Sequence, residues 1–89
     1  MRGSGSFRQL ERKHNMVDLF ELHAFVMFYC VQYETIHINT KYDPRCFRLC
    51  VMINNGENYV TKFVYCSKTN EAKAVVNDCV IDFLARFGT

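Results

Sequence analysis

The clearest pattern of apolar and polar positions lies near the end of the chain, at residues 67–87. Apolar side chains recur there every three or four residues, and mostly polar side chains fill the positions between them. This spacing predicts an amphipathic helix with one buried face. Its predicted apolar face consists of Ala72, Val75, Val76, Cys79, Val80, Phe83, Leu84 and Phe87.

Three shorter segments alternate with a period of two and predict β-strands at residues 33–40, 47–53 and 59–66. Residues 41–45 contain the only proline, Pro44, and predict a loop. Asn54-Asn55-Gly56 predicts a hairpin turn, because Asn and Gly accept a positive φ. The second strand is expected to turn one face to the core, made of Phe47, Leu49, Val51 and Ile53.

A first helix is predicted ahead of the strands, with Asn15 as its cap and Asp18 in its first turn. We expect it to end between Val26 and Cys30. Apolar side chains, among them Phe20 and Phe28, surround this helix almost completely. Such a helix is either buried on all sides or covered by a partner.

The predicted element order is α-β-β-β-α. It indicates an α+β fold in which both helices cover one face of a three-stranded antiparallel sheet. We expect one domain at residues 15–89, after an expression-tag-like segment at 1–6 and a polar lead-in at 7–14. The third strand of such a meander lies at an edge of the sheet.

The composition narrows the function classes. The 89 residues are 49% hydrophobic and carry a net charge of +2, which suits one small core and gives no overall attraction to nucleic acid. The longest apolar run, residues 24–31, is far shorter than the ~20 residues that span a bilayer. We therefore expect no membrane partner.

The five cysteines are an odd number and form no CxxC pair. This pattern favours free thiols in a reducing compartment, cytoplasmic or nuclear. A zinc site at Cys46 and Cys50, completed by a histidine, is the competing interpretation. On one strand, however, these two residues would lie ~13 Å apart, too far to share a metal ion. A Cys-His hydrolase has no supporting motif either, so we expect no cofactor, no metal and no enzymatic activity.

The segment from Phe47 to Leu84 resembles the double-stranded-RNA-binding domain (dsRBD). It has an apolar strand, an Asn-Gly turn, a second strand, Ser-Lys, and then a helix with Ala72-Lys73 in its first turn. RNA-binding members open this helix with Lys-Lys-x-Ala-Lys, whose lysines clamp phosphates, and insert a Gly-Pro-x-His loop into the minor groove. Here Thr69 and Asn70 replace two lysines, and the loop at residues 41–45 has neither Gly nor His.

In lacking both motifs, the chain resembles the third domains of Dicer cofactors such as TAR-RNA-binding protein and Loquacious, which dimerise or bind Dicer. The resemblance implies a non-catalytic module of RNA silencing and RNA processing that acts through protein interaction. It would form a homodimer or dock on an RNA-processing enzyme such as Dicer. The alternative is a duplex-RNA-binding domain with atypical basic contacts. The candidate RNA contacts are Lys41, Arg45, Lys68 and Lys73, and Asp43 and Glu71 reduce the charge among them.

The third strand is the expected interaction surface. One lysine in eight residues protects its edge poorly against pairing with another strand, and strand addition is a common mode of recognition. Two copies meeting there would build one six-stranded sheet about a two-fold axis. Base stacking on its aromatic residues is the less common alternative to strand packing. The candidate residues are Tyr59, Val60, Lys62, Phe63, Val64 and Tyr65.

Overall fold

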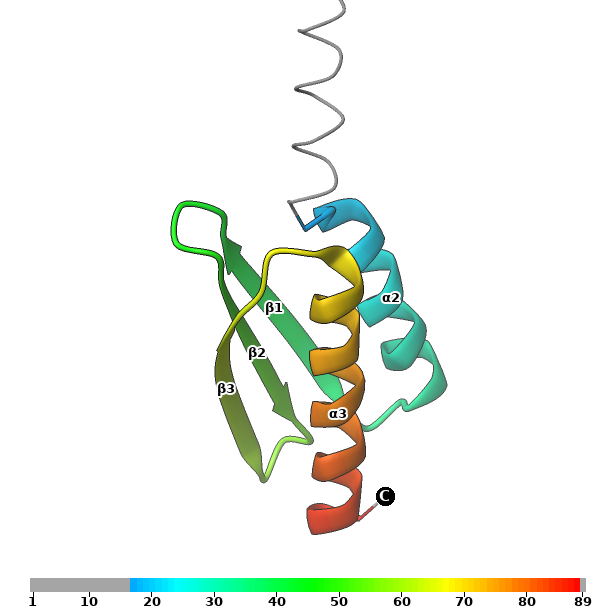
Figure 1. Cartoon of the computed structure of the whole chain (residues 1–89). Helices are drawn as coiled ribbons and strands as arrows, with labels where there is room; N and C mark the ends of the chain where they lie inside the picture. The colour runs from blue at the N-terminus through cyan, green and yellow to red at the C-terminus, as the bar shows by residue number, and fades with distance from the viewer. Residues whose placement is uncertain (1–16, 89) are drawn as a thin grey trace, which may run out of the picture.

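The computed structural model describes residues 17–88. Its elements, labelled as in Figure 1, are α2 (Leu19–Gln32), β1 (His37–Asp43), β2 (Arg48–Asn54), β3 (Tyr59–Tyr65) and α3 (Thr69–Phe87). The strands form one antiparallel sheet in the order β1-β2-β3. Both helices cover the same face of it (Figure 1). The predicted α+β architecture is therefore confirmed, while the expected tag, the lead-in and Asn15 lie outside the described residues.

Helix α2 begins and ends later than predicted. Asp18 is its N-cap and not part of its first turn, since its Oδ1 accepts a hydrogen bond of 3.1 Å from the Glu21 N–H. The helix continues to Gln32, where the N–H of Tyr33 donates to the Tyr29 carbonyl at 2.8 Å. Neither Gly nor Pro interrupts the helix before that point, so nothing in the sequence stops it at Val26–Cys30.

Strand β1 lies further along the chain than predicted. It covers His37–Asp43, which includes three of the five residues of the expected loop, and the residues after Tyr33 form a turn instead. The reason is the ladder with β2, which pairs His37 with Asn54 and Asp43 with Arg48. Pro44 has no N–H to continue this ladder, so the β1–β2 connection is residues 44–47.

The β2–β3 hairpin is confirmed. Gly56 has a φ of 94°, and the Asn55 side chain accepts hydrogen bonds from the N–H groups of Glu57 and Asn58 at 3.0 and 2.8 Å. Phe47, however, was wrongly expected to face the core. It lies in the turn before β2 with a φ of 57° and is 47% exposed, because the left-handed backbone there breaks the alternation of the strand.

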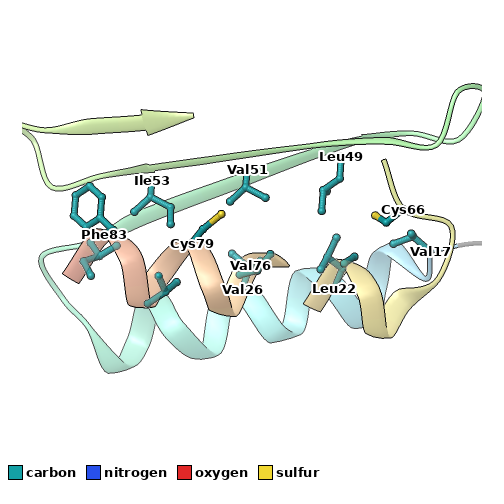
Figure 2. Close-up of a cluster of buried hydrophobic side chains, with 13 residues drawn as sticks. Val17, Leu22, Val26, Leu49, Val51, Ile53, Cys66, Val76, Cys79 and Phe83 are labelled. Carbon is teal, nitrogen blue, oxygen red and sulfur yellow. The ribbon is translucent and has the colours of Figure 1, made fainter. Parts of the chain in front are cut away.

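The core fills the space between the sheet and the two helices (Figure 2). Leu49, Val51 and Ile53 of β2 are each at most 1% exposed, and burying one such side chain stabilises the fold by ~1.5–3 kcal/mol. Phe87 departs from the prediction, because it lies in the last turn of α3 and stays 37% exposed. The buried residues contributed by the helices are Leu22, Val26, Ala72, Val76, Cys79, Val80 and Phe83.

Helix α3 begins at Thr69, two residues later than predicted. The Glu71 carboxylate accepts hydrogen bonds from the N–H groups of Ser67 and Lys68 at 3.1 and 3.2 Å, which fixes the chain entering the helix. The Thr69 hydroxyl accepts a hydrogen bond of 2.8 Å from the Asp18 N–H. The starts of α2 and α3 are therefore tied together. Within residues 17–88, no helix combines the length and the apolar content needed to cross a membrane.

Candidate functional site

The sheet has two outer edges, and they differ in chemistry. The edge at β1 presents polar residues such as Asn39 and Lys41. The edge at β3 lies on the side of the sheet away from α2 (Figure 1). Of its residues, Tyr59, Phe63 and Tyr65 are 74%, 59% and 77% exposed. The predicted place of the third strand at a sheet edge is confirmed.

The register assigns the side chains of β3 to the two faces of the sheet. Val64, Lys62 and Val60 pair with the buried residues of β2 and share their face, toward the helices. Val60 and Val64 are accordingly half-buried against the core. The other face, here called the open face, carries Tyr59, Thr61, Phe63 and Tyr65 from β3.

Two backbone hydrogen bonds show which groups of β3 point outward. At the two ends of the β2–β3 ladder, the Asn55 N–H donates to the Asn58 carbonyl at 3.2 Å and the Cys66 N–H donates to the Phe47 carbonyl at 2.9 Å. Bonded and non-bonded pairs alternate between these ends. The N–H and C=O groups at the free edge therefore belong to Tyr59, Thr61, Phe63 and Tyr65.

Lys62 and Val64 thus direct their backbone groups to β2 and not to the free edge. A proline at either position would break the internal ladder of the sheet, so it is Thr61 or Phe63 that tests edge pairing. Lys62 is the only charge of β3, and its side chain lies on the helix face. An inward-pointing charge protects an edge in part, but it leaves the open face of β3 without any charge.

The open face also contains a shallow depression of about 620 Å³. The side chains of Lys41, Arg48, Cys50, Met52 and Phe63 line part of it. The Arg48 guanidinium lies over the Phe63 ring at 5.4 Å, a cation–π arrangement. The aromatic residues of β3 therefore continue into a surface that has an apolar floor and a basic rim.

The four candidate RNA contacts do not share one surface. Lys41 points to the open face of β1, opposite Cys50, whereas Lys68 and Lys73 belong to the start of α3 on the helix side. Arg45 pairs with Asp43 through Nε–Oδ1 and Nη2–Oδ2 contacts of 3.2 Å each. This hydrogen bonding from Arg45 lowers the pKa of Asp43 and offsets the charge of the guanidinium.

Lys73 is also engaged within the fold. Its Nζ pairs with the Glu21 carboxylate of α2 and lies 5.7 Å from the centre of the Phe25 ring. Within residues 17–88, Lys41 and Lys68 are the two candidates that form no ion pair. The ion pairs of Arg45 and Lys73 therefore leave fewer cations for a phosphate backbone than the sequence suggests. Glu21 and Lys73 lie 52 positions apart, so no local pattern in the sequence reveals their contact.

The cysteines are thiols in this structure. Cys66 and Cys79 are buried, Cys30 and Cys50 are half-buried, and Cys46 is exposed in the β1–β2 turn and not on a strand with Cys50. Burial raises the pKa of the Cys66 and Cys79 thiols, which makes them poor nucleophiles. In the described part of the chain, no three His, Cys, Asp or Glu side chains gather closely enough to hold a metal ion.

Helix α2 presents an apolar surface that the sequence suggested only in outline. One side of it packs on the core, so burial on all sides is excluded. Its other side is exposed at Phe20 (91%), Val31 (74%) and Phe28 (65%).

No family model, no curated protein and no solved structure matches the chain.

Proposed function

We propose that this domain is a non-catalytic, dsRBD-like protein-interaction module and that its partner at the β3 edge is a second copy of the chain. The observation that carries the proposal is the free edge of β3. Its outward backbone groups belong to the same residues whose aromatic side chains are exposed on the open face, Tyr59, Phe63 and Tyr65. A strand that pairs there gains a ladder and apolar contacts together.

A second copy fits this edge because the contact is self-complementary. Two β3 strands related by a two-fold axis would offer each other identical rows of N–H and C=O groups. Apart from Lys62, which faces the helices, β3 carries no charge that would repel its copy. Docking on an RNA-processing enzyme such as Dicer would use the same edge, and it is the competing outcome of the test below.

Duplex-RNA binding is the weaker of the two functions under consideration. Affinity for a phosphate backbone grows with the number of cations placed on it. Two of the four candidate cations, Arg45 and Lys73, are in ion pairs. The five thiols fit a reducing, intracellular environment, as the proposed role in RNA processing requires.

The test compares two Thr→Pro substitutions. Thr61→Pro removes an outward N–H from the β3 edge, and Thr40→Pro is the matched control, since the same alternation turns the N–H of Thr40 outward at the β1 edge. Light scattering on the wild type at high micromolar concentration should give the mass of two chains. Thr61→Pro should lower it to one chain, while Thr40→Pro should not.

Hydrogen exchange separates self-pairing from docking on another protein. In the proposed dimer, the Thr61 and Phe63 amides of the wild type exchange slowly. Dilution removes the protection of both amides, and Thr61→Pro removes that of the Phe63 amide. If the wild type instead stays monomeric and these amides exchange fast until an RNA-processing enzyme is added, the partner of the β3 edge is that enzyme and not a second copy. Fast exchange under every condition would refute the role of the edge.

A further inference from the structure

The exposed side of α2 carries a second apolar surface, well separated from the β3 edge. Phe20, Ala24, Met27 and Val31 follow one another at intervals of four, three and four residues, and all four are exposed. We call this row the outer stripe. Phe20 and Ala24 each lie two residues from the buried Leu22, which places the stripe ~200° around the helix from the core.

Spacings of three and four residues are the pattern of helix-to-helix packing. They keep apolar side chains on one seam, where each one fits between residues of the facing helix. Helix α2 has only one acidic residue, Glu21, and this residue already pairs with Lys73. The outer stripe therefore offers a helix-shaped apolar seam without charges that would select a charged partner.

The order of side chains along the stripe is self-complementary. In an antiparallel pair of α2 helices centred between Phe25 and Val26, Phe20 faces Val31 and Ala24 faces Met27. Every layer then combines a larger side chain with a smaller one, as close packing requires. A parallel pair would instead stack Phe20 on Phe20 and leave a gap between two copies of Ala24.

We infer that the outer stripe is a second self-association surface, which packs antiparallel on the outer stripe of another copy of this chain. Phe28 and His23 flank the seam on opposite sides. The two-fold axis of an antiparallel pair keeps each flank with its own copy, so the two Phe28 side chains line one flank and the two His23 side chains line the other. This contact is separate from the proposed pairing at β3. At millimolar concentration, where the weaker contact also forms, a chain with two different two-fold contacts assembles beyond the dimer.

The exposed area sets the expected strength. Phe20 and Phe28 are 91% and 65% exposed, which corresponds to roughly 300 Å² of aromatic surface. Met27 and Val31 are 47% and 74% exposed and enlarge the patch, toward the upper end of patches found on monomers, about 600 Å². Stable interfaces bury ~800 Å² per partner, so the α2 contact belongs to the weak, concentration-dependent class.

A charge placed in the stripe tests the contact. Ala24→Glu inserts a carboxylate at the centre of the seam. Ala74→Glu is the matched control, since Ala74 is also an exposed alanine in a helix but belongs to α3. Chains that carry Thr61→Pro should be monomeric at high micromolar concentration, and at millimolar concentration sedimentation should show the weak monomer–dimer equilibrium of the α2 contact. Ala24→Glu should weaken it at least tenfold, and Ala74→Glu should leave it unchanged. Equal sedimentation of all three proteins would overturn the inference without affecting the β3 proposal.

Cysteine cross-linking tests the antiparallel register. Phe20→Cys and Val31→Cys chains, mixed and mildly oxidised, should yield a disulfide between positions 20 and 31 of different copies, identified by mass spectrometry. Neither variant alone should link its introduced cysteine to the same position of another copy, because two copies of position 20, like two copies of position 31, lie ~16 Å apart along the antiparallel axes. That distance is beyond the ~7 Å that a disulfide spans. A disulfide joining position 20 of one copy to position 20 of another would show a parallel pair and refute the proposed packing.

Discussion

Lys73 of α3 pairs with Glu21 of α2, so a lysine that the dsRBD pattern would aim at a phosphate instead joins the two helices. The side chains are 26% and 49% exposed. The Lys73 ammonium also lies over the Phe25 ring, 5.7 Å from its centre. The position of a basic residue in a motif therefore does not decide its role, because an acidic residue from a distant part of the chain can form an ion pair with it.

The first prediction concerns this pair. Glu21→Gln should release Lys73 and remove one negative charge, so duplex-RNA binding at low salt should rise a few-fold. The ion pair is partly exposed and solvent-screened, so the free energy of unfolding should fall by less than about 1 kcal/mol. Filter binding and chemical denaturation measure the two effects. Unchanged RNA affinity together with a loss of several kcal/mol would mean that Glu21 serves the fold and has no influence on RNA.

The second prediction concerns the strength of RNA binding in the wild type. Lys41 and Lys68 are the candidates outside ion pairs, and they lie on different surfaces. A plot of the logarithm of the association constant against the logarithm of salt concentration should therefore have a slope no steeper than about −2. Binding should be weak and insensitive to duplex length. Tight binding at physiological salt that Lys73→Ala abolishes would show that Lys73 leaves Glu21 to clamp RNA.

The third prediction concerns alkaline pH. The Tyr42 hydroxyl donates a hydrogen bond of 2.8 Å to the Cys66 carbonyl, and burial is the main cause that raises the pKa of Tyr42 above its ordinary value near 10. The folded state therefore favours the protonated phenol. Its contribution to stability is complete below pH ~10 and is lost as the pH rises through the folded-state pKa.

Tyr42→Phe should accordingly lower the free energy of unfolding at neutral pH by about 1 kcal/mol, the usual contribution of one hydrogen bond. It should also make the loss of stability above pH ~10 shallower. The buried Cys66 thiol, whose pKa is raised too, supplies part of what remains. Denaturation curves at neutral pH and at several alkaline values measure both effects. A steeper alkaline loss in Tyr42→Phe would contradict this assignment.

The features that local patterns determine were predictable. The Asn-Gly turn and the three-to-four-residue spacing of α3 depend on neighbours in sequence, and they identified the hairpin and the buried residues from Ala72 to Phe83. The bounds of β1 were not predictable in this way. They depend on which residues of β2 pair with β1, and the alternating segment at 33–40 fits a strand equally well when shifted.

For the edge strand β3, the sequence predicted one feature and could not predict another. Its position at the margin of the sheet followed from the order of strands. Which of its N–H groups point outward depends on the hydrogen bonds between Phe47 and Cys66 and between Asn55 and Asn58, and these became visible only in three dimensions. Phe47 itself was misplaced because its φ of 57° is rare for a large side chain.

The last prediction separates the side chains of β3 by the face they occupy. Phe63 is 59% exposed on the open face, so Phe63→Glu should leave the melting temperature within a few degrees of wild type. A charge there should still weaken self-association at β3 at least tenfold, because pairing places it in an apolar contact.

Val64 is half-buried against the core beside Leu49. Val64→Glu should therefore lower the melting temperature strongly, by burying a carboxylate without a partner. Calorimetry and light scattering on the two variants decide the matter. If Phe63→Glu remains as dimeric as wild type while Thr61→Pro is monomeric, the backbone ladder alone holds the edge and the aromatic residues of the open face serve another purpose.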